Sequence, residues 1–235
     1  MKEAHELAII MPVYNESGAI GTVVKKWSAV LDALAIDYSF HVYNDGSKDN
    51  TLEILNELSG NYDRLIVHDK KNSGHGPTIL LGYRENSNCK WIFQTDSDDE
   101  LPPDDFEILW KNRNDYDFLI GIRDDRDSKP IRKFITGISR LTVRVFYGKG
   151  VKDVNSPYRL YRTSVFKTYF EKIPENTFAP NVILSGIACL KKIRIFQTYV
   201  KHQNRQTGTV SIKRWKLLKA ALKSYWQTFS FRFKI

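Results

Sequence analysis

Short apolar runs alternate with helix-like segments along the first half of the chain, and this alternation restricts the folds that the chain can adopt. The predicted strands cover residues 7–13, 38–43, 65–68, 91–94 and 118–122. Predicted helices fill the intervals between them. Strands and helices that alternate at this spacing form βαβ units with right-handed crossovers. We therefore predict an α/β fold with a mostly parallel sheet.

The pattern is less regular after residue 122. Helical patterns cover residues 131–147, 164–170, 177–190 and 212–229, and strand patterns cover residues 154–161 and 193–200. In the first half, Ser17 is the predicted N-cap of a helix that ends near residue 34. Because no internal repeat or long linker is visible, we predict one domain over residues 1–210 and a basic helical extension over residues 211–235.

The composition excludes several classes of protein. Apolar residues make up 42% and aromatic residues 13% of the 235-residue chain, which excludes disorder over most of its length. Its two cysteines, Cys89 and Cys189, are too few for a disulfide scaffold and fit a reducing compartment. The longest near-apolar runs, residues 7–13 and 182–190, fall short of the roughly 20 residues that span a bilayer. We predict neither a membrane span nor a signal peptide.

Positive charge is concentrated near the C-terminus. The chain has 36 Lys and Arg residues against 27 Asp and Glu residues, which gives a net charge of +9. The last acidic residue is Glu175, and residues 176–235 contain 12 basic residues. Such a block binds the phosphates of a nucleic acid, a lipid surface or a phosphorylated substrate, or it is simply a solvated basic surface.

The predicted helix 212–229 combines this positive charge with large apolar side chains. Its basic members are Lys213, Arg214, Lys216, Lys219 and Lys223, and its apolar members include Trp215, Leu217, Leu218, Leu222 and Trp226. A helix with these two faces can lie in a membrane interface, where each basic residue contributes roughly 1 kcal/mol. The alternative is a helix that docks on the domain or pairs two subunits.

Polar groups follow three of the predicted strands. Tyr14 and Glu16 follow the first strand, Asn44 and Asp45 follow the second, and Asp96 follows the fourth. In a parallel sheet, ligands bind outside the carboxyl ends of the strands. A turn with an exposed Glu16, or an Asx turn at Asn44, is an ordinary feature by itself. The convergence of all three segments is what predicts a ligand site.

Four carboxylates stand within five residues in the segment Asp96-Ser97-Asp98-Asp99-Glu100. They repel one another unless solvent or a cation neutralises them. Alternate positions after a strand can aim two carboxylates at one point, and Mg²⁺ typically takes one or two carboxylates plus substrate phosphates. The alternative is a solvated acidic loop. A second loop, residues 72–76 around Gly74, could hold a phosphate through its backbone N–H groups.

Together these segments resemble a family 2 glycosyltransferase with the GT-A fold. The matching segments are Met11-Pro12-Val13-Tyr14-Asn15-Glu16, Asn44-Asp45-Gly46-Ser47-Lys48-Asp49-Asn50-Thr51, Asn72-Ser73-Gly74-His75-Gly76 and Asp96-Ser97-Asp98, in the family's order. The resemblance covers residues 7–210. It implies a Rossmann-like, mostly parallel sheet flanked by helices, with a basic C-terminal helical extension.

Within that family the chain looks most like the dolichol-phosphate mannose synthases and polyprenyl-phosphate sugar transferases. In that branch the acidic pair is followed by a polar residue and prolines, as in Glu100, Pro102 and Pro103 here. Residues 121–123, 132–136, 153–162 and 202–208 are also similar to that branch.

The resemblance implies roles on the donor side of the site. Pro12, Tyr14 and Glu16 would contact the nucleoside of a nucleoside diphosphate sugar. Asn44 and Asp45 would lie near the base. The site for the diphosphate and for Mg²⁺ or Mn²⁺ would consist of Asp96, Asp98 and Glu100.

It also implies roles on the acceptor side. Arg123, Arg132 and Thr136 would hold the acceptor phosphate, so Asp98, Arg123 and Arg132 are the predicted catalytic residues. Arg205 would lie in a loop that closes over the site. The helix from residue 212 would lie at the membrane surface.

Among the departures from the family, two bear on the chemistry of the site. An acid usually stands at the position of Asn44, and many members carry a catalytic carboxylate in the region of residues 176–183, where this chain has none. A sugar hydroxyl needs a general base to remove its proton. A phosphate monoester, with a second pKa of about 6, is already ionised and needs only orientation and charge neutralisation by groups such as arginine. The missing carboxylate therefore favours a phosphate acceptor.

We therefore predict an inverting, metal-dependent glycosyltransferase that moves a sugar from a UDP or GDP sugar to a polyprenyl or dolichyl phosphate. It would be cytoplasmic and peripheral at the inner face of the membrane. One alternative is a family 2 enzyme that acts on a saccharide hydroxyl in glycan assembly. A second is a non-catalytic module whose basic tail binds a membrane or nucleic acid. Only charge supports nucleic-acid binding, so we expect no nucleic-acid partner.

Overall fold

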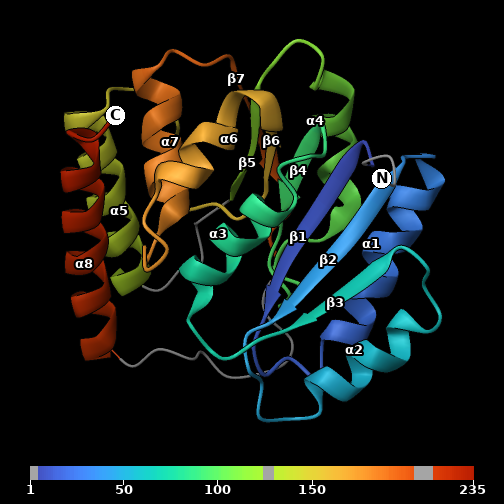
Figure 1. Cartoon of the computed structure of the whole chain (residues 1–235). Coiled ribbons are helices and arrows are strands. Elements are labelled where there is room, and N and C mark those ends of the chain that lie inside the picture. Colours follow the sequence, from blue (N-terminus) through green and yellow to red (C-terminus); the bar gives the residue numbers. More distant parts are fainter. Residues whose placement is uncertain (1–4, 124–129, 204–213) are drawn as a thin grey trace.

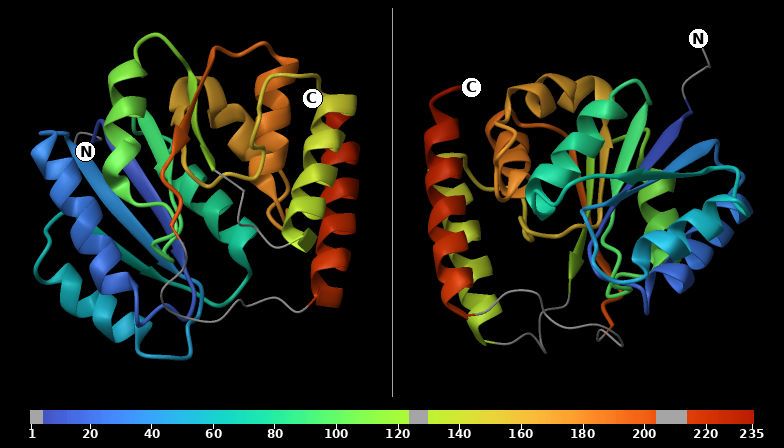
Figure 2. Two further views of the ribbon diagram at one scale, coloured as in Figure 1. Left: turned by 180° about the vertical axis from the view of Figure 1, so that it is seen from behind. Right: turned by 60° about the horizontal axis from the view of Figure 1, so that its bottom comes forward.

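The computed structural model describes residues 5–123, 130–203 and 214–235, and it builds a seven-stranded sheet with helices on both faces (Figures 1 and 2). The side chains of residues 130–135, 214–218 and 220 lie outside the described part. The strands are β1 (Leu7–Val13), β2 (Tyr38–Asn44), β3 (Leu65–Asp69), β4 (Trp91–Gln94), β5 (Phe118–Arg123), β6 (Arg159–Arg162) and β7 (Ile195–Val200). The helices are α1 (Ile20–Ala33), α2 (Thr51–Ser59), α3 (His75–Glu85), a short 3-10 helix (Pro103–Asp105), α4 (Phe106–Asn112), α5 (Pro130–Phe146), α6 (Thr163–Lys172), α7 (Pro180–Leu190) and α8 (Arg214–Arg232).

The sheet is mostly parallel, as the alternating pattern predicts. Its strand order is β3-β2-β1-β4-β6-β5-β7. Strand β6 runs antiparallel to β4 and β5, and the other neighbouring pairs are parallel. Strands β1 and β2 are buried along their whole length. Burial explains why β1 is a continuous apolar run in the sequence, whereas β2 alternates and buries polar side chains such as Ser39 and His41.

Two hydrophobic cores lie on opposite faces of the sheet, and β1 contributes to both. Its residues Leu7, Ile9 and Met11 pack with α1, α2 and α4 on one face. Ala8 and Ile10 pack with α3, α6 and α7 on the other face. This division follows from the two-residue period of a strand, which points successive side chains to opposite faces.

Several element boundaries differ from the sequence prediction. Helix α1 begins at Ile20, and its N-cap position is Ala19 with no side-chain cap. Ser17 therefore does not cap α1, and its backbone N–H instead donates to Oδ2 of Asp49 at 3.2 Å. Helix α7 begins at Pro180, which suits the first turn of a helix because proline lacks an N–H group. Strand β6 begins at Arg159 and ends at Arg162, so it covers only the last three residues of the predicted segment 154–161.

Helices α5 and α8 lie side by side at the edge of the molecule, beyond α7, with their C-terminal ends together (Figures 1 and 2). The Tyr147 hydroxyl donates to the carbonyl of Thr228 at 2.6 Å, and Nε of Arg232 donates to the carbonyl of Phe146 at 2.8 Å. The rings of Phe146 and Phe229 meet at 4.9 Å between centroids. Among the described residues, no helix has the length and apolar character needed to cross a bilayer.

A pair of histidines, one buried and one half-buried, lies on the face of the sheet that α3 covers. His41 of β2 is 9% exposed, and its Nδ1 lies 3.0 Å from Nε2 of His68 on β3. The ring of Tyr43 stacks on His68 at 4.2 Å between centroids. Burial, with a smaller contribution from His68, lowers the pKa of His41 to about 3, so the native imidazole stays neutral well below pH 6.5.

The depressed pKa of His41 predicts a loss of stability in mild acid. Below pH 6.5 the unfolded chain takes up a proton at residue 41 that the native chain excludes, so the free energy of unfolding falls by up to about 1.4 kcal/mol per pH unit. We expect urea titrations between pH 7 and pH 5 to show a steeper fall for the wild type than for His41→Gln, whose amide cannot be protonated. Equal slopes would contradict this assignment.

Candidate active site

The predicted site residues lie where four parallel strands end, at the lower edge of the sheet in Figure 1. The chain passes from β1 to β2 and β3 on one side and then returns to β4 on the other side of β1. This reversal makes the ends of β1 and β4 a topological switch point, the place where open α/β sheets bind ligands. The loops of Tyr14 and Glu16, and of Asp96 and Asp98, follow those two strands.

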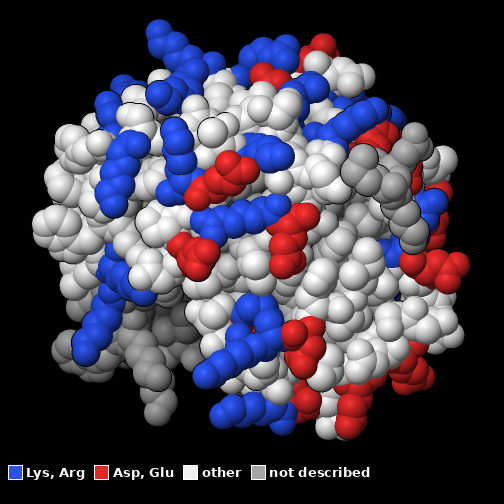
Figure 3. Space-filling view, viewed as in Figure 1, with Lys and Arg blue, Asp and Glu red and all other residues white. Residues whose placement is uncertain are grey.

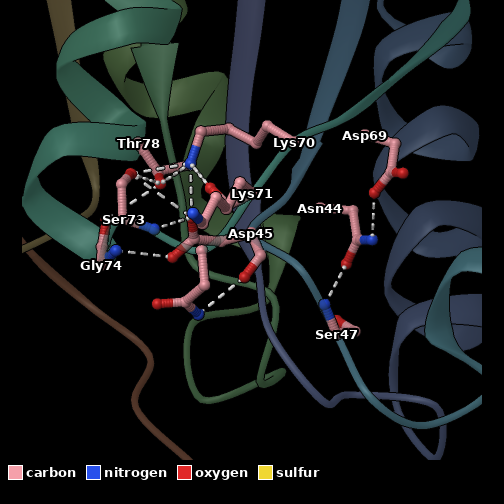
Figure 4. A network of polar contacts seen from close by, with 10 residues as sticks. Asn44, Asp45, Ser47, Asp69, Lys70, Lys71, Ser73, Gly74 and Thr78 are labelled. Atoms are coloured by element: carbon pink, nitrogen blue, oxygen red, sulfur yellow. Dashed lines mark hydrogen bonds and ion pairs between the residues drawn. The ribbon is translucent and has the colours of Figure 1, made fainter.

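The carboxylate of Asp45 organises the loop that precedes α3 (Figure 4). Its Oδ1 accepts hydrogen bonds from the Lys70 ammonium and from the Ser73 N–H, the latter at 2.8 Å. Its Oδ2 accepts the N–H of Gly74 at 2.8 Å. Lys70 also donates to the hydroxyls of Ser73 and Thr78, at 2.7 and 3.2 Å. Asp45 and Gly74, both predicted substrate-binding residues, are thus brought into direct contact.

The ionised form of Asp45 is stable although the residue is only 4% exposed. Burial alone would raise the pKa of this carboxyl group, but Lys70 and the two backbone N–H groups outweigh burial and hold the pKa below its ordinary value. Both carboxylate oxygens already accept hydrogen bonds from the protein itself. Asp45 therefore fixes the shape of the loop rather than presenting an open acceptor to a ligand.

Both polar atoms of the Asn44 side-chain amide are hydrogen-bonded. Its Nδ2 donates to Oδ1 of Asp69 at 2.7 Å, and its Oδ1 accepts the N–H of Ser47 at 3.2 Å (Figure 4). Asn44 is 1% exposed, whereas Asp69 at the end of β3 is exposed. Asp69 thus presents an accessible carboxylate beside the buried Asn44. The sequence reasoning missed Asp69 because the residue belongs to no motif.

The loop after β1 is tied to the loop after β2. Pro12 is buried within β1, and Tyr14 is half-buried just beyond the strand. The N–H of Glu16 donates to the hydroxyl of Thr51 at 2.9 Å, and the N–H of Asn15 donates to the hydroxyl of Ser47 at 3.0 Å. These bonds hold the loop of the predicted nucleoside contacts against the segment that follows Asn44 and Asp45.

The acidic loop after β4 lies beside the start of α3. Oδ1 of Asp96 is 3.7 Å from Nε2 of His75, the residue after Gly74, and the Asp96 side chain is 32% exposed. Asp98, also partly exposed, accepts the N–H of Glu100 at 3.2 Å. Asp99 adopts a positive φ of 59°, and its carboxylate binds Lys26 of α1 at 2.6 Å. The acidic loop, which contains the predicted metal ligands, therefore lies next to the loop that Asp45 anchors.

Gly76 fixes the position of α3 against the segment that precedes α7. A Cβ atom at residue 76 would lie 2.2 Å from the carbonyl oxygen of Phe178 and 2.4 Å from that of Thr177. No side chain fits in that space, so only glycine permits this approach of the two segments.

Residues 201–203, just after β7, hold the acidic loop from the other side. The imidazole Nε2 of His202 lies 3.4 Å from Oε2 of Glu100, and both side chains are mostly buried. The N–H of Gln203 donates to the carbonyl of Glu100 at 3.0 Å, and the N–H of Lys201 donates to Asp105 at 2.6 Å. His202 is a second residue that the sequence reasoning gave no role, although it opens the similar segment 202–208.

The donor set of the acidic loop fits a hard divalent cation. Asp96 and Asp98 supply carboxylate oxygens on one partly exposed loop, and Mg²⁺ or Mn²⁺ bound with a diphosphate needs only one or two protein carboxylates. Among the described residues, no three Asp, Glu, His or Cys side chains form a group that could hold a metal by themselves.

On the acceptor side, Arg123 forms a two-point ion pair with Asp153. Its Nε and Nη2 lie 2.9 and 3.1 Å from the two carboxylate oxygens, and Asp153 is 4% exposed. Burial would raise the pKa of Asp153, but Arg123 outweighs burial and lowers the pKa. Thr136 is half-buried in α5. The side chain of Arg132 and the whole of Arg205 lie outside the described residues.

A family model described as "Glycosyl transferase family 2" matches residues 8–170, which include the loops after β1, β2, β3 and β4. The chain belongs to glycosyl transferase family 2. The resemblance seen in the sequence motifs is thereby confirmed.

Similar proteins agree with this membership. An undecaprenyl-phosphate 4-deoxy-4-formamido-L-arabinose transferase from Edwardsiella ictaluri is 27% identical over 205 residues, 86% of this chain and 61% of the relative. The chain spans about three fifths of the length of the curated relatives that it matches.

Solved structures share the fold. Glucosyl-3-phosphoglycerate synthase from Mycobacterium tuberculosis matches 98% of this chain and 81% of its own, with a TM-score of 0.72 and 15% identity. A mannosyltransferase from Pyrobaculum calidifontis, solved with GDP-Man and Mn²⁺, matches 100% of this chain and 66% of its own, with a TM-score of 0.64 and 12% identity. The predicted GT-A fold is confirmed.

The Asp45–Lys70 ion pair predicts a strong effect of a single substitution. In Lys70→Met the buried carboxylate loses its cationic partner, and we expect the free energy of unfolding to fall by about 2–4 kcal/mol. The double variant Asp45→Asn/Lys70→Met should recover part of this loss, because its side chain at residue 45 is neutral. Lys71→Met, at the exposed neighbouring lysine, is the matched control and should change little. Equal effects of Lys70→Met and Lys71→Met in urea titrations would refute the assignment.

Proposed function

We propose that this chain is an inverting glycosyltransferase that moves a sugar from a UDP or GDP sugar to a polyprenyl or dolichyl phosphate. The observation that carries the proposal is the partly exposed Asp96 and Asp98 pair at the switch point, beside the loop that Asp45 anchors. The curated relatives named as undecaprenyl-phosphate sugar transferases support the acceptor class. The catalytic unit would comprise residues 1–210.

On the donor side, Asp96 and Asp98 would bind Mg²⁺ or Mn²⁺, with Glu100 and the adjacent His202 close by. The cation would neutralise charge that develops on the leaving diphosphate. Pro12, Tyr14 and Glu16 would line the nucleoside side of the crevice. At the base, the exposed Asp69, held by the buried amide of Asn44, would provide an acceptor for a base N–H group.

On the acceptor side, an ionised phosphate oxygen would attack the anomeric carbon while the bond to the diphosphate breaks. No general base is required, because the phosphate is already deprotonated at neutral pH. The two-point ion pair with Asp153 holds the Arg123 guanidinium in one orientation, and this cation would neutralise part of the charge of the acceptor phosphate. We expect Arg132 and Thr136 to act with Arg123, and Arg205 to close over the site.

The α5–α8 face would contact the membrane. Its exposed apolar side chains are Leu141, Val145, Leu222, Trp226 and Phe233, between 57% and 72% exposed. Exposed basic residues, among them Lys219 and Lys223, stand beside them, and Figure 3 shows basic and uncharged surface on the side where α8 lies. Apolar side chains framed by positive charge fit the interface of an anionic leaflet. Residues 211–235 would thus hold the enzyme peripherally at the cytoplasmic face.

A thermal-unfolding series tests the donor site. One nucleoside diphosphate among UDP, GDP, CDP and ADP, at 100 times its dissociation constant and with Mn²⁺, should stabilise the protein by about 2.7 kcal/mol, or roughly 5 to 10 °C. Asp98→Ala should unfold at the wild-type temperature without ligand, lose this shift and lose transfer. Asp104→Ala, at an exposed carboxylate of the 3-10 helix that follows the acidic loop, is the matched control. Absence of any Mn²⁺-dependent shift in the wild type would contradict the donor site.

A transfer assay with three acceptors tests the acceptor and the membrane face together. With the donor sugar identified, the enzyme should use undecaprenyl phosphate in anionic vesicles and farnesyl phosphate in solution, but not farnesol, which lacks the phosphate. The double variant Leu222→Ser/Trp226→Ser should lose at least fivefold in transfer to the vesicle acceptor only, because it removes membrane contacts and leaves the crevice intact. Transfer to farnesol or to a saccharide would favour the hydroxyl-acceptor alternative.

A further inference from the structure

A chain of buried polar side chains lies directly behind Asp96. Gln94, the last residue of β4, is 0% exposed, and Asn181, in the first turn of α7, is 7% exposed. Tyr83 of α3 is also fully buried. Such groups are costly to bury unless each of them is hydrogen-bonded, so their arrangement is strongly determined.

The direction of every bond in this chain follows from the charge of Asp96. An ionised carboxylate only accepts hydrogen bonds, so the Gln94 amide must turn Nε2 toward Oδ1 of Asp96, at 3.1 Å. Its Oε1 then faces inward and accepts Nδ2 of Asn181 at 2.8 Å. Oδ1 of Asn181 in turn accepts the Tyr83 hydroxyl at 2.9 Å. No amide in this relay can be reversed without placing two acceptors face to face.

The inner end of the relay is anchored by Arg159. This arginine is 0% exposed, and its Nη1 donates to the backbone carbonyl of Asn181 at 3.0 Å and to the hydroxyl of Ser185 at 3.3 Å. Its Nε donates to the carbonyl of Ser156 at 2.6 Å. The first turn of α7 is thereby fixed relative to β6, and the Asn181 amide has one position from which to reach Gln94.

We propose that Gln94 and Asn181 are positioning residues that hold the Asp96 carboxylate in the orientation in which it binds the divalent cation. This inference rests on the proposed function for the metal itself. Asn181, a neutral amide on α7, would thereby act on the metal side of the site through Gln94.

The test is the affinity of the site for Mn²⁺, measured by calorimetry with MnCl₂ in the presence of saturating UDP and, in parallel, GDP. Asn181→Asp is nearly isosteric but presents an acceptor to Oε1 of Gln94, and Gln94→Met removes the bond to Asp96. Each should weaken Mn²⁺ binding 10- to 100-fold, the usual effect of losing an outer-shell partner. Asn86→Asp is the matched control, because it makes the same exchange at a buried amide whose partners, the Tyr43 hydroxyl and the Gly82 carbonyl, lie outside the relay. Its Mn²⁺ affinity should stay within twofold of the wild type.

Each outcome decides between the two proposals. If the wild type fails to bind Mn²⁺ both in the presence of UDP and in the presence of GDP, the proposed function fails and this inference fails with it. If the wild type binds Mn²⁺ and either folded variant binds it within twofold of the wild type, the relay does not position Asp96, and the proposed function stands. Thermal unfolding shows which variants are folded. If Gln94→Met does not fold, the test is made with Asn181→Asp, which conserves the volume of the side chain.

Discussion

The parallel pairing of β1 with both β2 and β4 is the constraint on which the candidate site depends. In register, Val13 of β1 lies opposite Asn44 of β2, and Ile10 lies opposite Gln94 of β4. Because parallel strands end at one edge of a sheet, the loops that follow these strands must share that edge. Loops far apart in sequence therefore meet only if β1 stays central, and both hydrophobic cores hold it there.

Buried charge at this edge makes the site rigid. Asp45, Asp153 and Arg159 are each nearly inaccessible to solvent, and each is surrounded by several hydrogen-bond partners. A buried charge is costly unless it is well paired, so loops that carry such charges have few alternative conformations. Preorganised loops lose little entropy when a charged ligand binds, which suits a site that must hold a diphosphate next to carboxylates.

Much of this arrangement could be predicted from the sequence. Strands such as β1 and β4 were located because buried parallel strands are short apolar runs, and the acidic loop was located because carboxylates follow one of them directly. The partners of Asp45 and Asn44 could not be predicted, because Lys70 and Asp69 lie 25 residues further along the chain and belong to no motif. The boundary of α1 was wrong because the Ser17 backbone binds Asp49, a contact that local propensity does not encode. The roles assigned to Arg132 and Arg205 stay predictions, since neither side chain is described.

The close approach at Gly76 has a consequence for how such a site can diverge. Helix α3 carries the loop that Asp45 anchors, and the segment pressed against Gly76 leads into α7, which carries Asn181. A larger residue at position 76 would move both elements at once. The loop that Asp45 anchors and the hydrogen-bonded side chains behind Asp96 therefore share one packing contact, and a lineage cannot enlarge residue 76 to reshape one of them alone.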